Sequence, residues 1–166
     1  MFRRSGSGNY SYTAARVKAK KSKILKAEDY NKLLAMSVPE ISRYISEAGY
    51  SKEITDMADK HSGLSLLEYA TYANMASAFR SILSASKGDC KLVVGAYLRE
   101  WDYRNLLTIV RGKRSNLSAD AIRMDLVPAG HLKAEDFERL MQIGSVDEVL
   151  TACADAMNVR IPDDVM

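Results

Sequence analysis

The feature that most constrains the fold of this chain is a phrase that occurs twice. KAEDYNKLLAM at residues 26–36 returns as KAEDFERLMQI at residues 133–143, with five of eleven positions identical and four more exchanged for a similar residue. A second matched phrase follows each copy, SVPEI at residues 37–41 and SVDEV at residues 145–149. Internal repetition with a long period indicates a chain assembled from copied modules.

The sequence is compatible with two explanations of the repetition. Duplication is favoured by a third, fainter pair that precedes the others, VKAKKSKI at residues 17–24 and VRGKRSNL at residues 110–117. The alternative is convergence of similar helix starts, because SVPEI and SVDEV both have the pattern of a capping box. In that motif the serine oxygen accepts from a free N–H group of the new helix, and the glutamate three residues on reaches back.

The rest of the chain predicts helices and no strands. Apolar residues recur at helical spacing, and no stretch of four or more residues alternates as a strand does. Helices are expected over residues 10–25, 27–36, 37–48, 52–61, 64–85, 91–111 and 118–125, and the second KAED opens a further pair. The sequence therefore predicts an all-α fold of helical bundle repeats. We expect a mobile leader at residues 1–9, a first repeat at residues 10–91 and an incomplete second repeat at residues 92–166.

Charge is unevenly distributed although the net charge is only +3. Residues 1–26 carry eight lysines and arginines and no acid, whereas the remainder is acidic on balance. This asymmetry predicts a polyanion, a membrane surface or an acidic protein as the partner of the N-terminal end. Cys90 and Cys153 are isolated, which fits reduced thiols in a cytosolic protein. No segment has the pattern of a signal peptide or of a bilayer-spanning helix.

Few residues could support catalysis. His61 and His131 lie far apart in the sequence, and there is no Walker loop, GxGxxG or GxSxG motif and no cluster of metal-ligating residues. We therefore expect no enzyme activity, no cofactor, no metal and no small-molecule substrate. One alternative role is a helical nucleic acid-binding adaptor, since the lysines of ARVKAKKSKILK could neutralise phosphates.

Asp102 interrupts an otherwise apolar helical line that includes Leu98, Leu106 and Ile109. If that line is buried, the carboxylate needs a partner, and Arg99 or Arg80 is the expected cation. The alternative is that Asp102 faces solvent. We expect Arg99, Trp101 and Asp102 to act structurally.

Several phrases together carry a resemblance to a known family: NYSYTAARVKAKKSKIL, YNKLLAMSVPEISRYI, YLREWDYRNLLTIVRGK, DLVPAGHL and SVDEVL. They resemble the C subunit of the archaeal or bacterial A/V-type rotary ATPases, which is similar to the d subunit of eukaryotic vacuolar ATPases. The resemblance implies an all-helical funnel of three related units. It also implies a longer chain, so we expect this one to be a fragment with its second unit cut short and its third missing.

The same resemblance implies a non-catalytic role in the central stalk. A protein of this family is expected to couple the rotating shaft to the membrane proteolipid ring, at the cytoplasmic face of the cell membrane, in a motor that moves protons or sodium ions. We expect the partners to meet a basic surface and its counterpart in the second copy, namely Arg16, Lys18, Lys20, Lys21, Arg111, Lys113 and Arg114. The alternative is that each of these side chains is merely solvated. Helix faces left bare by an incomplete unit also predict homo-oligomer contacts.

Overall fold

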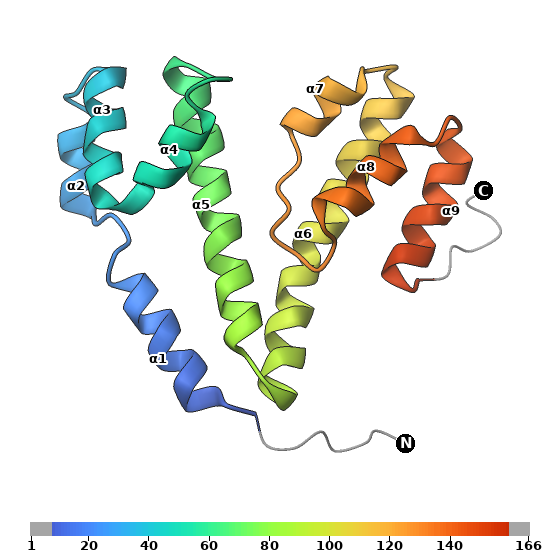
Figure 1. The fold of residues 1–166 in the computed structure, drawn as a ribbon, viewed down its shortest axis with the longest axis horizontal. Helices are drawn as coiled ribbons and strands as arrows, with labels where there is room; N and C mark the ends of the chain where they lie inside the picture. The colour runs from blue at the N-terminus through green and yellow to red at the C-terminus, as the bar shows by residue number, and fades with distance from the viewer. Residues whose placement is uncertain (1–7, 160–166) are drawn as a thin grey trace. The chain divides into compact units, whose positions relative to one another are not determined.

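The structure, a computed structural model, describes residues 8–159, and every regular element in that range is helical (Figure 1). The helices are α1 (Tyr10–Lys21), α2 (Ala27–Leu33), α3 (Val38–Ile45), a π-helical turn η1 (Ser46–Tyr50), α4 (Ser51–Met57), α5 (Gly63–Ala85), α6 (Gly88–Arg114), α7 (Ala119–Met124), α8 (Ala134–Gln142) and α9 (Val146–Met157). The prediction of an all-α fold is confirmed. Among the described residues, no helix is both long enough and apolar enough to cross a membrane.

The chain divides into two compact units, Met1–Val94 and Gly95–Met166. In the described part of the chain the first unit contains α1 to α5, and the second contains most of α6 together with α7, α8 and α9. The boundary between the units falls inside α6. Whether the two units are copies of one ancestral module stays a prediction. Most of the predicted mobile leader lies outside the described residues.

The first unit is organised around the long helix α5, against which α1, α3 and α4 pack. Its fully buried apolar residues are few and mostly small, and they include Ile45, Ala70 and Ala76. The course from α3 to α4 breaks at Gly49, whose φ of 110° lies in the left-handed region that glycine tolerates. The sequence predicts a helix end at this glycine, and the structure places it there.

Asn9 ties the start of α1 to the end of α5. Its side-chain amide donates to the carbonyl of Ala85 at 2.8 Å, and its carbonyl oxygen accepts from the N–H of Lys87 at 2.7 Å. The preceding residue, Gly8, lies so close to α6 that an added Cβ would stand 2.5 Å from the backbone nitrogen of Cys90. These contacts fix the first residues of α1 against the turn between α5 and α6.

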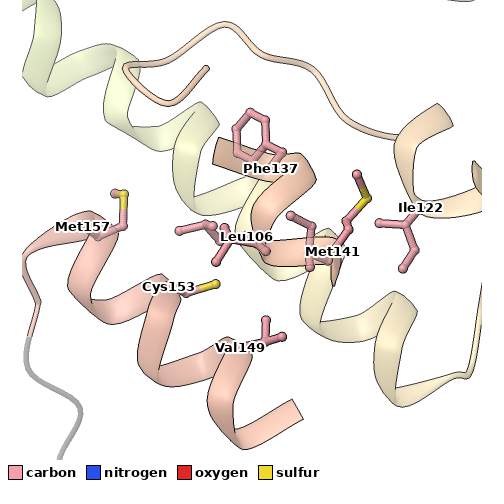
Figure 2. Packing of buried hydrophobic residues seen from close by; sticks show 9 residues of the cluster. Leu106, Ile122, Phe137, Met141, Val149, Cys153 and Met157 are labelled. Atoms are coloured by element: carbon pink, nitrogen blue, oxygen red, sulfur yellow. The ribbon is translucent and has the colours of Figure 1, made fainter. Parts of the chain in front are cut away.

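The second unit has a larger apolar core, in which α8 and α9 pack together and α6 and α7 contribute further residues (Figure 2). Its buried members are Leu106, Ile109, Ile122, Phe137, Leu140, Met141, Val149, Cys153 and Met157. Gly112 allows α7 to approach, because a Cβ there would lie 2.5 Å from Cγ1 of Ile122. Burial raises the pKa of the Cys153 thiol to about 11, so this cysteine acts as a packing group.

The two KAED phrases begin helices in the same way. Lys26 has φ −94° and ψ 168°, and Lys133 has φ −95° and ψ 167°. In each copy the aspartate three residues on accepts from the backbone N–H of that lysine, Asp29 at 2.8 Å and Asp136 at 2.9 Å. The local geometry of the repeated phrase is therefore itself repeated.

Ser37 and Ser145 are the N-cap residues of α3 and α9, as the sequence predicts. The hydrogen bonds differ between the copies. Glu40 accepts from both the backbone N–H of Ser37, at 2.7 Å, and its hydroxyl, at 2.6 Å. In the second copy the hydroxyl oxygen of Ser145 accepts from the N–H of Glu148 at 3.5 Å. The glutamate side chain thus takes part in the cap of the first copy, whereas the serine oxygen makes the capping bond of the second.

Candidate functional site

The first basic surface lies on α1 in the first unit. Lys18 and Lys21 are exposed, whereas Lys20 is half-buried. Arg16 is also exposed, but its guanidinium donates to the Tyr12 hydroxyl at 3.2 Å and to Oγ of Ser81 on α5 at 3.3 Å. Arg16 therefore helps to dock α1 on α5, whereas Lys18 and Lys21 face solvent.

The second basic surface occupies the last turn of α6 in the second unit. Arg111 and Arg114 are exposed, and Lys113 is half-buried. The amine of Lys113 donates to the backbone carbonyl of Ile143, the C-cap residue of α8. Lys113 thus connects α6 to the α8–α9 turn, which gives it a structural role that the sequence does not reveal.

The two basic surfaces match position by position. Alignment of VKAKKSKI with VRGKRSNL pairs Lys18 with Arg111, both exposed, and Lys21 with Arg114, both exposed. It also pairs the two half-buried lysines. Both sets end a helix, where positive charge interacts favourably with the helix dipole. The favourable interaction with the helix dipole therefore accounts for part of the effect of these basic residues.

Asp102 is almost completely buried, at 1% exposure, and its charge is satisfied by a loop. Oδ2 accepts from the backbone N–H of His131 at 2.9 Å, and Oδ1 accepts from the N–H of Leu132 at 3.0 Å. The Nδ1 atom of His131 lies 3.7 Å from Oδ2. The sequence predicts an arginine as the partner, but these backbone groups take that place, and Arg99 is exposed. Such charge-assisted bonds are strong.

Two further residues of this arrangement were missed by sequence reasoning. Asn105 is buried one turn along α6, where its amide donates to the carbonyl of Val127 at 2.7 Å and accepts from the N–H of the same residue at 2.8 Å. Gly130 passes so close that an added Cβ would stand 2.1 Å from Oδ1 of Asp102. We call Asp102, Asn105 and Gly130 the loop clamp. Two polar residues three apart on one apolar helix face were the signal in the sequence.

Trp101, the residue before Asp102, is half-buried, and the guanidinium carbon of Arg104 lies 5.4 Å from the centre of its ring. Arg123 joins α7 to α8 through Glu138 at 2.6 Å, and this pairing lowers the pKa of the Glu138 carboxyl. Within residues 8–159 no group of three or more histidines, cysteines or acids could hold a metal ion. The loop clamp, the contact of Lys113 with Ile143 and the Arg123–Glu138 ion pair are suited to holding helices in fixed positions.

The chain matches the model of a protein family described as ATP synthase (C/AC39) subunit over residues 13–159. It is similar to the C subunit of the A-type ATP synthase of Archaeoglobus fulgidus, with 39% identity over 141 residues, and of Halobacterium salinarum, with 36% identity over 148 residues. The protein of the same name from Methanosarcina mazei is 34% identical over 150 residues. No solved structure gives a significant match to the chain.

These alignments cover between 85% and 90% of this chain but only 41% to 42% of each relative. The chain therefore spans less than half the length of the curated relatives that it matches. The similarity extends through both units, from α1 to the end of α9.

Proposed function

Because this chain belongs to the ATP synthase (C/AC39) subunit family, we propose that it is a non-catalytic part of the central stalk of an A/V-type rotary ATPase. In this role it couples the rotating shaft to the membrane proteolipid ring at the cytoplasmic face of the membrane. The complex uses this coupling to move protons or sodium ions. The family match over residues 13–159 is the observation on which the proposal rests.

The physical properties of the fold agree with such a role. Transmission of torque requires no reactive group, but it requires a body that resists deformation. Packed helical interiors are dense and have low compressibility. In the second unit the loop clamp and the amine of Lys113 add cross-connections between α6 and the segments that follow it.

The proposal is tested by isolating a tagged copy of the chain from cells that contain an A-type ATP synthase. We expect the shaft proteins and the ring protein of the enzyme to be recovered with it, as detected by mass spectrometry. Recovery of the tagged chain without any other ATP synthase component would contradict the proposed role.

The basic surfaces are proposed as the partner-facing regions, and the structure indicates which residues to change. Lys18→Glu with Lys21→Glu tests the surface of α1, and Arg111→Glu with Arg114→Glu tests that of α6. Lys113 is unsuitable, because its change would also break the contact with Ile143. Lys52→Glu with Lys60→Glu, at exposed positions elsewhere in the first unit, is the matched control. If only the control variant lost its partners, neither basic surface would be the interface.

A further inference from the structure

Helix α2 of the first unit has apolar residues at the positions that form the buried face of α8 in the second unit. Alignment of the two KAED phrases pairs Tyr30 with Phe137, Leu33 with Leu140 and Leu34 with Met141. The three α8 residues are buried, with exposed fractions of 2%, 6% and 5%. In α2, all of whose residues the structure describes, none is buried, and Tyr30 is 55% and Leu34 87% exposed. The same apolar face is thus covered in one copy and bare in the other.

The first unit holds α2 by another side of the helix. The hydroxyl of Tyr44 on α3 donates to Oδ1 of Asp29 at 2.7 Å. Leu33, one turn after Asp29 on that side, is half-buried. Tyr30 and Leu34 are also one turn apart, and each follows a residue of the α3 side, so they point about 100° further round the helix. We call the exposed pair Tyr30 and Leu34 the α2 face.

The second unit shows what kind of element covers such a face. Phe137 and Met141 share one apolar core with Leu106 and Ile109 of α6 (Figure 2). Leu106 and Ile109 are three residues apart, which places them on one side of their helix. The side chains that cover the equivalent face therefore come from a helix with aliphatic residues at helical spacing.

The charge around the α2 face restricts the occupant further. Lys26 is exposed one turn before Tyr30, whose N–H donates to the Lys26 carbonyl. Residues 16–26, which lead into α2, carry six lysines and arginines and no acid. A helix laid on the face is therefore favoured by acidic residues beside its apolar stripe, because opposite charges across an interface select and orient the partner.

We propose that the α2 face docks an amphipathic helix of a partner protein, with aliphatic residues on one side and acidic residues beside them. Exposed apolar side chains that line up on a surface mark a contact with another protein, and an apolar helix face is a common form of such contacts. The apolar pair supplies the affinity and Lys26 favours one orientation. The α2 face is separate from the two basic surfaces, and the inference does not depend on the proposed function.

A synthetic helix tests the proposal with the whole chain. The probe is a fluorescently labelled peptide of alanine, leucine and glutamate, with leucines at positions i, i+3, i+4 and i+7 and glutamates beside them. A second peptide of the same composition has its leucines spread around the helix. We expect fluorescence anisotropy to show saturable binding of the first peptide alone. Absence of binding, or equal binding of both peptides, would overturn the proposal.

A pair of variants locates the binding site. Leu34→Glu should raise the dissociation constant of the first peptide by about tenfold or more, because it places a charge in the centre of the contact. Leu64→Glu is the matched control, since Leu64 is 69% exposed in the first unit and lies outside the α2 face. Circular dichroism checks that both variants keep their helices. No loss of affinity for Leu34→Glu, or the same loss for Leu64→Glu, would place the site elsewhere and overturn the proposal.

The role of charge is tested at Lys26. Lys26→Glu should weaken binding of the acidic peptide and strengthen binding of a peptide in which lysines replace the glutamates. Lys52→Glu, at an exposed position on α4, is the control and should leave both affinities unchanged. If Lys26→Glu and Lys52→Glu had the same effect, the acidic character of the partner would be wrong.

The occupant itself is identified by cross-linking in the native cell. A photo-reactive benzoylphenylalanine replaces Leu34 in one chain and Leu64 in another, and mass spectrometry identifies the cross-linked peptide. We expect position 34 alone to cross-link to a helical segment of another protein that has acidic residues beside an apolar stripe. A cross-link to a second copy of this chain or to lipid, or the same products from both positions, would overturn the proposal.

Discussion

At the scale of single residues, Asp102 explains why the loop between α7 and α8 has a defined course. A buried carboxylate is costly unless its oxygens are paired, and here they accept from the N–H groups of His131 and Leu132. Removal of the carboxylate leaves those two donors without their acceptor.

We expect Asp102→Ala to lower the free energy of unfolding by about 3 kcal/mol, because loss of a buried acceptor leaves its donors unsatisfied. Urea denaturation followed by circular dichroism measures the change. Asp125→Ala, at an exposed acid next to the same loop, is the control and should change stability little. An unchanged unfolding midpoint for Asp102→Ala would show that the carboxylate contributes nothing to the position of the loop.

Gly130→Ala should be destabilising by about 2 kcal/mol, because the new methyl group would overlap the Asp102 carboxylate and force the loop to shift. The control is Gly144→Ala, since no atom lies within 4 Å of a Cβ placed there. Combining Gly130→Ala with Asp102→Ala should cost less than the sum of the two single changes, because the obstructing carboxylate is then absent. Strictly additive unfolding free energies would contradict the close contact.

At the scale of helices, the two KAED starts share an acid-sensitive hydrogen bond. The hydrogen bond from the Tyr44 hydroxyl and that from the N–H of Lys26 hold the pKa of Asp29 below its ordinary value of 3.8. The N–H of Lys133 is the largest cause of the lowered pKa of Asp136. The folded state therefore stabilises the ionised carboxylates of Asp29 and Asp136 relative to the unfolded state.

The sign of the pH dependence follows from that difference. Below pH 3.8 the unfolded chain takes up these protons before the folded chain does. The stabilisation is therefore complete above this pH and is lost as pH falls through the lower folded-state pKa. We expect Asp29→Asn with Asp136→Asn to lower the thermal midpoint at pH 6 and to flatten its fall in acid. Equal acid slopes for native chain and variant would contradict the assignment.

Sequence reasoning was most successful where the signal was local. The starts of α2, α3, α8 and α9 follow from KAED and from the capping serines, because an N-cap is a contact within a few residues. Helix ends were less accurate: α1 was expected to reach residue 25 and ends at Lys21, whereas α6 was expected to end at residue 111 and reaches Arg114. Asp102 was singled out from the sequence, but its loop partners, as well as Asn105 and Gly130, were missed, because the groups in contact are more than twenty residues apart in the chain.

At the scale of the whole molecule, the two units differ in how much apolar surface each buries. Within residues 8–159, the buried side chains of the first unit include Thr13, Ala70 and Ala76, whereas those of the second include Phe137 and Ile109. Burial of large apolar side chains is the main favourable contribution to folding. The first unit should therefore be the less stable of the two, and the chain should not unfold in a single step.

The single tryptophan of the chain makes this difference measurable. Trp101 lies in the second unit, so its fluorescence follows that unit, whereas far-ultraviolet circular dichroism follows the helices of both. In urea we expect part of the dichroism signal to be lost before the fluorescence changes.

Paired core variants test the assignment of the two transitions. Phe137→Ala should lower the stability seen by Trp101 fluorescence by about 3–5 kcal/mol and leave the earlier dichroism transition in place. Ile45→Ala, in the core of the first unit, should shift only the earlier transition. Because each change removes buried atoms from one unit alone, coincident shifts of both signals in either variant would mean that the units unfold together, and the two-unit description of stability would have to be abandoned.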